Sequence, residues 1–325
     1  MNGCMPGAET PKIAILMAVY EPRLDWLREQ LLSLEEQTYP NIKLYIRDDC
    51  SPAVPIEAIQ ACVSESIRSF SWELWRNEKN LGSTGTFERL TAEAEGAYFA
   101  YCDQDDIWDS DKIAVMSSIL QKDPSIDVLC CAVEPFYEDG GKKVRVYGAV
   151  DNAKSVDDLD APSFDEKFMA VRRPGCSYAV KSNFIREILP YWQDDFAHDG
   201  MLWRFSLLKG TLRLLNRPLI RFRRHDSNAT EMRYLDKRSR IGEIEMCLRF
   251  SNALEEYCSS NPGDYRGSST HIEHYRSVLD ARMHLLEGGL KISDLGIILK
   301  YREYELSNCS LLGDLKALIS SGDSK

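Results

Sequence analysis

Hydrophobic and polar positions follow two alternating patterns along the first 130 or so residues. Residues 12–19 read KIAILMAV, an almost unbroken apolar run that is typical of a strand buried on both faces of a sheet. Leu24, Leu27, Leu31 and Leu34 then recur at spacings of three and four, which predicts an amphipathic helix. The same two patterns repeat, predicting strands at 42–47, 71–76, 97–102 and near 128–132, and helices at 55–67, around 87–94 and around 113–120.

This alternation predicts the fold class. Strand and helix alternate four times, which calls for an α/β sheet with right-handed crossovers. In such sheets ligands bind beyond the carboxyl ends of the strands. Two acidic clusters fall at predicted strand ends, Asp48-Asp49-Cys50-Ser51 and Asp103-Gln104-Asp105-Asp106. Several carboxylates there are hard to explain as folding devices, so a binding site is predicted at this edge.

The second half of the chain is less regular. A hairpin turn is predicted at 138–141, an acidic loop at 151–160, a strand at 175–180, helices at 181–189 and 199–208, and two short strands within 211–223. Beyond residue 240 the pattern changes to helical segments, predicted at 241–258, 271–286 and 292–305. We therefore expect one α/β domain over 11–230 and a helical C-terminal appendage over 240–325.

Composition and charge narrow the class of protein. The chain has 325 residues, of which 44% are hydrophobic and 28% charged, an ordinary balance for a globular protein. The formal net charge of −11 argues against a nucleic-acid partner. An acidic protein that handles phosphates needs a cation or a local group of Arg and Lys to offset the repulsion.

The ten cysteines contain no C-x-x-C pair, so zinc and redox motifs are unsupported and reduced thiols in a cytoplasmic protein are expected. The first ten residues lack the apolar stretch of a signal peptide, and no apolar run approaches the ~20 residues that span a bilayer. The sequence is compatible with contact between the protein and the inner face of the membrane and with self-association of the chain.

The cluster at 103–106 is the strongest chemical signal. Carboxylates at i and i+2 after a buried strand can face one hard cation, and Mg²⁺ or Mn²⁺ suits such oxygen ligands. The structural alternative is an Asx-turn with Asp109 or Asp111 capping the next helix. In the other cluster Asp49 can accept from a base N–H or a ribose hydroxyl, or simply cap a helix.

Eight short motifs occur in an order that resembles the GT-A family 2 glycosyltransferases, and in particular the bacterial branch with rhamnosyltransferase-like enzymes of surface polysaccharide assembly. The motifs lie at 16–21, 36–40, 48–51, 77–82, 103–108, 174–176, 198–199 and 224–226. Each motif alone is weak, but the ordered set is specific, and the resemblance covers about residues 11–230.

The resemblance implies a GT-A fold, in which a mixed, mostly parallel sheet is flanked by helices, and it implies a role for each matching residue. The nucleotide pocket would be lined by Ala18, Tyr20, Glu21, Asn80 and Gly82, with Asp49 on the base and Asp103 and Gln104 near the ribose and diphosphate. Asp105 would be the principal metal ligand and Asp199 the catalytic base.

Two motifs depart from the family pattern, and one basic cluster is open to two interpretations. The usual Thr-Tyr-Asn is Val19-Tyr20-Glu21 here, which predicts a difference in base recognition, and the usual Glu-Asp is His198-Asp199. His225 either completes the metal site or touches the diphosphate, or it belongs to a surface group with its neighbouring arginines at 221–224. Asp199 could alternatively be only the N-cap of the helix that follows.

The predicted activity is transfer of a sugar from a metal-bound nucleotide-diphosphate sugar to a hydroxyl of a saccharide or lipid-linked saccharide. A single base opposite the leaving group implies inversion in one displacement. A sugar nucleotidyltransferase would carry a Gly-rich phosphate loop after the first strand, which is missing. A DxD-type phosphohydrolase would place its Asp pair on the first strand rather than the fourth. A non-catalytic sugar-binding module would not need both a metal site and a base.

Overall fold

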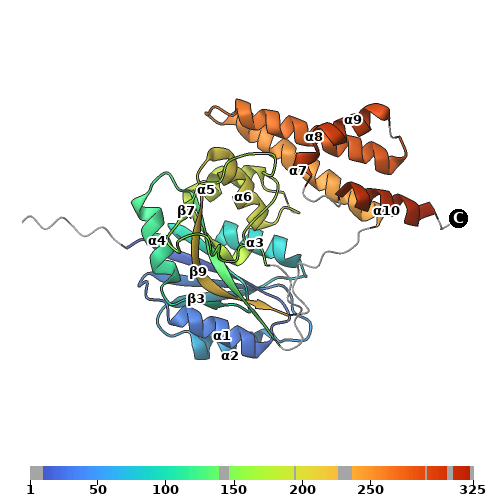
Figure 1. Cartoon of the computed structure of the whole chain (residues 1–325). Coiled ribbons are helices and arrows are strands. Elements are labelled where there is room, and N and C mark those ends of the chain that lie inside the picture. The colour runs from blue at the N-terminus through green and yellow to red at the C-terminus, as the bar shows by residue number, and fades with distance from the viewer. Residues whose placement is uncertain are drawn as a thin grey trace, which may run out of the picture.

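The computed structural model describes residues 10–138, 146–193, 195–225, 236–289, 291–305 and 310–322. These residues form one mixed nine-stranded sheet with helices on both faces and four further helices after the last strand (Figure 1). The strand order is β3-β2-β1-β4-β8-β6-β9-β5, and β7 pairs with β9 beside this path. The α/β class is therefore as predicted.

The strands are β1 (Ile13–Val19), β2 (Ile42–Asp48), β3 (Ser71–Arg76), β4 (Tyr98–Cys102), β5 (Ile107–Trp108), β6 (Val128–Tyr137), β7 (Leu159–Asp160), β8 (Tyr178–Lys181) and β9 (Leu212–Arg224). The α-helices are α1 (Leu24–Glu35), α2 (Ile56–Ser66), α3 (Gly82–Glu93), α4 (Lys112–Lys122), α5 (Ser182–Ile188), α6 (His198–Lys209), α7 (Lys237–Ser260), α8 (Arg266–Glu287), α9 (Ile292–Lys300) and α10 (Ser310–Gly322). Short 3₁₀ turns are η1 (Gly175–Ser177), η2 (Leu189–Tyr191) and η3 (Arg302–Tyr304).

The parallel half of the sheet brings the predicted strand ends together. β3, β2, β1 and β4 are parallel neighbours, as right-handed crossovers through α1, α2 and α3 require. Val19 of β1 pairs with Asp48 of β2, and Met17 pairs with Cys102 of β4. The loops after these three strands therefore leave the sheet at the same edge.

The other half of the sheet contains the antiparallel strands. β8 runs antiparallel to both β4 and β6, whereas β9 is parallel to β6. β5 pairs antiparallel with β9 through Ile107 and Arg221. Because β5 follows the acidic turn directly, this pairing places the end of β9 next to that turn.

Each face of the sheet has its own apolar core. One core joins α1, α2 and α4 to the sheet through residues such as Leu31, Val63 and Met116. The other joins α3, α5 and α6 through residues such as Leu90 and Phe205. In Figure 1, α1 and α2 lie below the sheet, and α5 and α6 lie above it.

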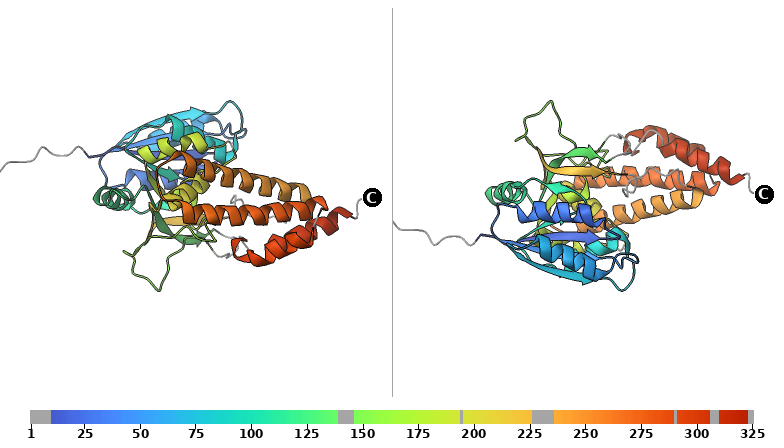
Figure 2. Two further views of the ribbon diagram at one scale, coloured as in Figure 1. Left: turned by 90° about the horizontal axis from the view of Figure 1, so that it is seen from above. Right: turned by 90° about the horizontal axis from the view of Figure 1, so that it is seen from below.

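The C-terminal helices extend the second core rather than forming a separate one. Phe250 of α7 stacks on Phe196 with ring centroids 3.9 Å apart, and Tyr257 meets Phe205 edge-on. Figure 2 shows α7 and α8 running side by side, with α10 along their far end. A buried carboxylate, Asp314 of α10, accepts from Arg282 of α8 at 2.7 Å. The domain boundary near residues 230–240 stays a prediction.

Several local expectations were wrong. Residues 211–223 form one long strand, β9, instead of two, and the acidic loop contains the short strand β7. The predicted strand at 175–180 begins as η1, and the last predicted helix ends at Lys300. α10 was not predicted at all. Most of the predicted hairpin turn at 138–141 lies outside the described residues.

Two findings concern the cysteines and the membrane. All eight cysteines in the described ranges are free thiols. Across those ranges, no helix combines the length and the apolar character that a transmembrane span requires.

The packing of α7 yields a stability prediction. Removing a buried aromatic ring typically costs ~3–5 kcal/mol, so Phe250→Ala should lower the free energy of unfolding by about that amount. Phe250 is 2% exposed, and the guanidinium of Arg204 lies 4.2 Å from its ring centroid. Urea denaturation measures the change. Leu299→Ala is the control, because Leu299 is 69% exposed and should change stability by less than ~0.5 kcal/mol. Equal effects of the two variants would contradict this packing.

Candidate active site

The segments that follow β1 and β2 have unusual backbone conformations and are joined to each other by hydrogen bonds. Among the described non-glycine residues, only Glu21 (φ 44°) and Cys50 (φ 59°) have positive φ angles. The amide of Glu21 donates to the Ser51 hydroxyl at 2.8 Å, and the amide of Asp49 donates to the Val19 carbonyl at 2.8 Å. Strained residues of this kind persist only where the surroundings over-determine them, and they are common at binding sites.

Asp49 organises the loop between β3 and α3. Its buried carboxylate accepts from the side-chain amide of Asn77 and from the backbone amide of Leu81, both at 2.8 Å. Asn80 donates to the Asp49 carbonyl at 3.4 Å and accepts from the Gly82 amide at 3.1 Å. Three predicted pocket residues, Asp49, Asn80 and Gly82, therefore meet in one loop arrangement. The left-handed φ of Gly82 (72°) favours glycine at that position.

Gln104 and Glu21 are engaged in holding backbone. Gln104 accepts from the Tyr20 amide at 2.9 Å and donates to the Tyr20 carbonyl at 3.1 Å, which joins the end of β4 to the end of β1. The carboxylate of Glu21 accepts from the Ala53 amide at 2.8 Å. The Tyr20 side chain is 46% exposed, and Ala18 is partly buried just inside the strand. The sequence pattern gave no sign of these framework contacts.

Arg223 fixes the acidic turn at 103–106. Its backbone amide donates to the buried carboxylate of Asp106 at 3.0 Å, and its Nε donates to the Asp105 carbonyl at 2.7 Å. The same guanidinium pairs with Glu29 of α1 and with Glu138. Because Arg223 is only 2% exposed, a purely surface role for the basic cluster is wrong for this residue.

The turn places Asp105 against His225. The Asp105 carboxylate and the His225 Nε2 lie 2.8 Å apart, and both side chains are largely buried, at 17% and 13% exposure. The imidazole also packs against Trp26, with ring centroids 4.8 Å apart. The two residues predicted to bind a metal are therefore neighbours, although 120 positions separate them in the sequence.

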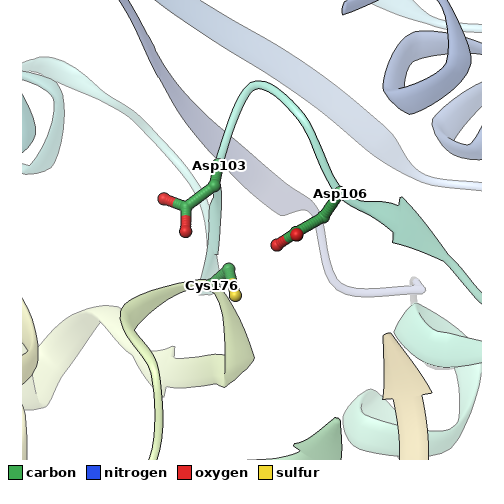
Figure 3. A group of neighbouring side chains, drawn as sticks. All are labelled: Asp103, Asp106 and Cys176. Atoms are coloured by element: carbon green, nitrogen blue, oxygen red, sulfur yellow. The ribbon is translucent and has the colours of Figure 1, made fainter. Parts of the chain in front are cut away.

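On the inner side of the turn, Asp103 and Asp106 converge with Cys176 (Figure 3). Their nearest ligand atoms all lie within 4.8 Å of one another. Burial, and next the charge of Asp105, raise the pKa of Asp103 to about 7, although a hydrogen bond from the Cys176 thiol opposes the shift. Burial, and then the charges of Asp103 and Asp105, also raise the pKa of Asp106. Burial raises the pKa of the Cys176 thiol.

These protonation and geometric properties show which of the two sets of side chains, Asp105 with His225 or Asp103 with Asp106 and Cys176, better suits a hard divalent cation. Mn²⁺ and Mg²⁺ prefer ionised oxygen ligands, and Mn²⁺ also accepts imidazole. A buried, protonated thiol is a poor ligand for either ion. Adjacent ligands in an octahedral shell at ~2.1 Å lie about 3 Å apart, close to the separation of Asp105 and His225. The donor set at Asp105 and His225 therefore fits Mn²⁺ or Mg²⁺ better than the cluster with Cys176.

The capping alternatives do not explain the acidic residues. Asp111 occupies the N-cap position of α4, but its side chain makes no capping hydrogen bond. The N-cap of α6 is Ala197, so the prediction of Asp199 as an N-cap is wrong. Asp199 lies in the first turn of α6, where its carboxylate accepts from the Gly200 amide at 2.7 Å.

His198 anchors this turn to the sheet. Its imidazole stacks on Tyr101 of β4, with centroids 4.5 Å apart, and meets Phe87 of α3 at 4.3 Å. It also fills the space over Gly175, where an added Cβ would lie 2.5 Å from the imidazole Nε2. The charge of Asp199 raises the pKa of Asp103, so the α6 turn and the acidic turn form one electrostatic unit. This explains why a Pro-Gly-Cys motif accompanies the His-Asp pair.

The fold and site together define the class of protein. An α/β sheet of this topology, flanked by helices, is the fold of GT-A glycosyltransferases. The family model of glycosyl transferase family 2 matches residues 14–202, so the chain belongs to that family and is a glycosyltransferase.

Comparisons with individual proteins agree with this family assignment. The chain is 27% identical over 241 residues to the dTDP-rhamnosyl transferase RfbG of Shigella flexneri, covering 70% of this chain and 78% of that protein. The structure of S. aureus TarS 1–349 in complex with UDP-GlcNAc superimposes with a TM-score of 0.61 at 11% identity. The match covers 96% of this chain and 91% of that one. The structure of the mannosyltransferase PcManGT from Pyrobaculum calidifontis, in complex with GDP-Man and Mn²⁺, superimposes with a TM-score of 0.54 at 12% identity. The match covers 96% of this chain and 88% of that one. At these identities the structural matches show the fold alone.

The raised pKa of Asp103 yields a prediction for the metal-free protein. A carboxyl group with a higher pKa when folded keeps its proton longer than in the unfolded chain, so folding stability falls as pH rises through the window between the two values. That window runs from about 4, the ordinary value, to about 7. Asp103→Asn removes this titration. We expect the stability of the variant relative to wild type to increase from pH 4 to pH 7 and then to level off, measured by urea denaturation in EDTA. A difference that is flat or falls over that window would contradict the assignment.

Proposed function

We propose that the protein is an inverting, metal-dependent glycosyltransferase. It moves a sugar from a nucleotide-diphosphate sugar to a hydroxyl of a saccharide or lipid-linked saccharide, in the synthesis of a bacterial surface polysaccharide. The observation that carries the proposal is the contact between Asp105 and His225 at the strand edge that also holds Asp49. The dTDP-rhamnosyl transferase name of one relative supports a nucleotide-sugar donor. So do UDP-GlcNAc and GDP-Man with Mn²⁺ in two structural neighbours.

The nucleotide would lie across the ends of β1, β2 and β4. Asp49 is held by two donors, but its carboxylate oxygens can each accept more than one bond, so it can still face a base N–H. Tyr20 is exposed at the rim and offers its ring face to a base. Glu21 is committed to the loop after β2, and this accounts for a base contact that differs from the usual family pattern.

The metal would be held by Asp105 and His225, next to the diphosphate. A bound Mn²⁺ or Mg²⁺ supplies positive charge to the departing nucleoside diphosphate. The chain itself keeps the two ligands in place, because Arg223 holds the Asp105 carbonyl and the Trp26 ring, tilted by 46° against the imidazole, limits its rotation. Asp103, whose pKa is raised to about 7, lies on the inner side of the turn, where a cation held nearby would favour its ionised form.

Asp199 is the base in this proposal. Its carboxylate takes the proton from the acceptor hydroxyl as that oxygen attacks the anomeric carbon. The helix N-terminus and the amide of Gly200 keep the carboxylate oriented. One base and one leaving-group site, without a second carboxylate as nucleophile, give inversion in a single displacement.

A cytoplasmic location, with contact at the inner membrane face or between copies of the chain, is part of the proposal. The C-terminal helices carry exposed apolar side chains that such a contact would cover, namely Ile292, Leu299 and Leu312.

Incubation with a panel of nucleotide sugars and Mn²⁺, without acceptor, tests the class of reaction. Slow release of free nucleoside diphosphate is expected, with dTDP-rhamnose the first donor to try. Formation of a nucleoside triphosphate when pyrophosphate is added would instead identify a nucleotidyltransferase. Binding of a nucleotide sugar without any turnover, with or without acceptor extracts, would identify a non-catalytic module.

Asp105→Asn should nearly abolish transfer, because it removes a charged ligand from the metal and so weakens the binding of both cation and diphosphate. Initial rates at limiting Mn²⁺ measure the effect. Asp264→Asn is the matched control, since Asp264 lies between α7 and α8 and its side chain is 67% exposed. Normal turnover of Asp105→Asn at limiting Mn²⁺ would show that the metal binds elsewhere.

Asp199→Asn should lower kcat by ~10²–10⁴-fold, as expected for removal of a general base. Donor binding should be nearly unchanged, because Asp199 faces the acceptor rather than the nucleotide in this proposal. Calorimetry with nucleoside diphosphate and Mn²⁺ separates the two effects. A large loss of nucleotide affinity would assign Asp199 to the donor site.

A further inference from the structure

A large cationic pocket lies apart from the proposed nucleotide site. Its volume is about 1200 Å³, and its walls are the segments 146–153 and 167–173, with Tyr137 and Arg204 between them. Four basic side chains line it, Lys167, Arg172, Arg173 and Arg204, against one acidic residue, Asp151. None of the predicted nucleotide-pocket residues borders it. In a chain of net charge −11, this concentration of positive charge calls for an explanation.

The basic side chains of this pocket have little negative charge to pair with. Arg172 has a carboxylate oxygen of Asp165 at 4.0 Å, the outer limit of an ion pair. Within the described ranges, no carboxylate oxygen lies within 4.0 Å of Arg173 or Arg204. Arg204 donates to the Met169 carbonyl at 2.9 Å, and Lys167 donates to the Glu305 carbonyl at 2.7 Å. The Nε atoms of Arg173 and Arg204 are buried without a hydrogen-bond partner.

Such an arrangement is costly in the absence of an anion. The Arg173 and Arg204 side chains are half-buried with their Nε atoms out of contact with water, and such loss of hydration is unfavourable for a cation without a counter-charge. Backbone carbonyls satisfy part of the hydrogen-bonding capacity of Arg204 and Lys167 but do not neutralise their charges. The planar guanidinium of arginine matches the oxygens of phosphate, and several basic residues together match its double negative charge.

The pocket lies beside the proposed catalytic base. Arg204 follows Asp199 by little more than one turn of α6, and its guanidinium packs against Gly200, where an added Cβ would lie 2.6 Å from it. Burial lowers the pKa of Arg204, and the charge of Asp199 is one of the smaller effects that oppose this shift. Arg204 therefore connects the pocket to the helical turn that carries Asp199.

We propose that this pocket binds a phosphate or diphosphate group of the acceptor, so that the acceptor is a phosphate-bearing saccharide. This inference rests on the proposed function and specifies its acceptor class. Arg173 and Arg204 hold the phosphate oxygens, and Lys167 and Arg172 add positive charge at the rim. The phosphate can be esterified to a lipid or to a soluble saccharide, since the pocket recognises the chemistry that both share.

Calorimetry on the whole chain, saturated with dTDP and Mg²⁺, tests the proposal. The probes are inorganic phosphate, glucose 1-phosphate, farnesyl diphosphate and the neutral methyl glucoside. We expect the phosphate-bearing probes to bind and methyl glucoside not to bind. Glucose 1-phosphate as the tightest ligand would indicate a soluble acceptor, and farnesyl diphosphate a lipid-linked one. Equal affinity for methyl glucoside and glucose 1-phosphate would overturn the proposal.

Arginine variants locate the binding. Arg173→Gln and Arg204→Gln should each weaken phosphate-probe binding about tenfold or more, the usual scale for loss of a hydrogen bond to a charged group. Arg266→Gln is the matched control, because the Arg266 side chain is 91% exposed on α8 and pairs only locally with Asp264. Two pocket variants are used because Arg204 also packs on Phe250, and its loss could perturb folding. Unchanged phosphate binding in folded Arg173→Gln would overturn the proposal.

Donor hydrolysis separates this inference from the proposed function. Arg173→Gln should release nucleoside diphosphate from donor at the wild-type rate and bind dTDP with wild-type affinity. A parallel loss of dTDP affinity would assign the pocket to the donor and overturn the inference. If wild type hydrolysed no donor yet bound phosphate through Arg173, the proposed function would fail while the phosphate site stood.

Discussion

The buried guanidinium of Arg223 holds the acidic turn after β4 in place, and the geometry of the site depends on that contact. One side chain reaches the Asp105 carbonyl, Glu29 of α1 and Glu138, while its own amide binds Asp106. It thereby ties the two halves of the sheet together, because β4 belongs to the parallel half and β9 to the other. With the turn held this way, the Asp105 carboxylate lies 2.8 Å from the Nε2 of His225, two positions after Arg223.

The electrostatics follow from this placement. Burial, and next the charges of the neighbouring carboxylates in this crowded turn, raise the pKa values of Asp103 and Asp106. A divalent cation relieves that repulsion, so the acids favour metal binding even where they do not ligate the ion. Arg204, which lines the arginine pocket, is close enough to Asp199 for their charges to interact. In this account the nucleotide-sugar with its metal and the phosphate-bearing acceptor occupy separate sites that both border the α6 turn.

The sequence predicted the framework well where local pattern determines structure. The strands β1 to β4 and their helices follow from apolar runs and helical spacing, and parallel pairing then brings their carboxyl ends to one edge. The contact between Asp105 and His225 was predictable only through the family resemblance. The contacts by which Arg223, Gln104 and Cys176 hold the site were not predicted, because burial and partners as far as 194 positions away are not visible in spacing. β9 was wrongly predicted as two strands, because its pairing with β6 continues through register shifts around Ala132, and such pairing is not visible in the sequence pattern.

The location of the cation tests the central claim most directly. Crystals soaked with Mn²⁺ and a nucleoside diphosphate would give an anomalous difference peak at the manganese edge. Because the contacts of Arg223 place Asp105 beside His225, we expect that peak to lie within bonding distance of both the Asp105 carboxylate and the His225 Nε2. A peak centred among Asp103, Asp106 and Cys176, or nucleotide bound in saturating Mn²⁺ with no peak near Asp105, would contradict it.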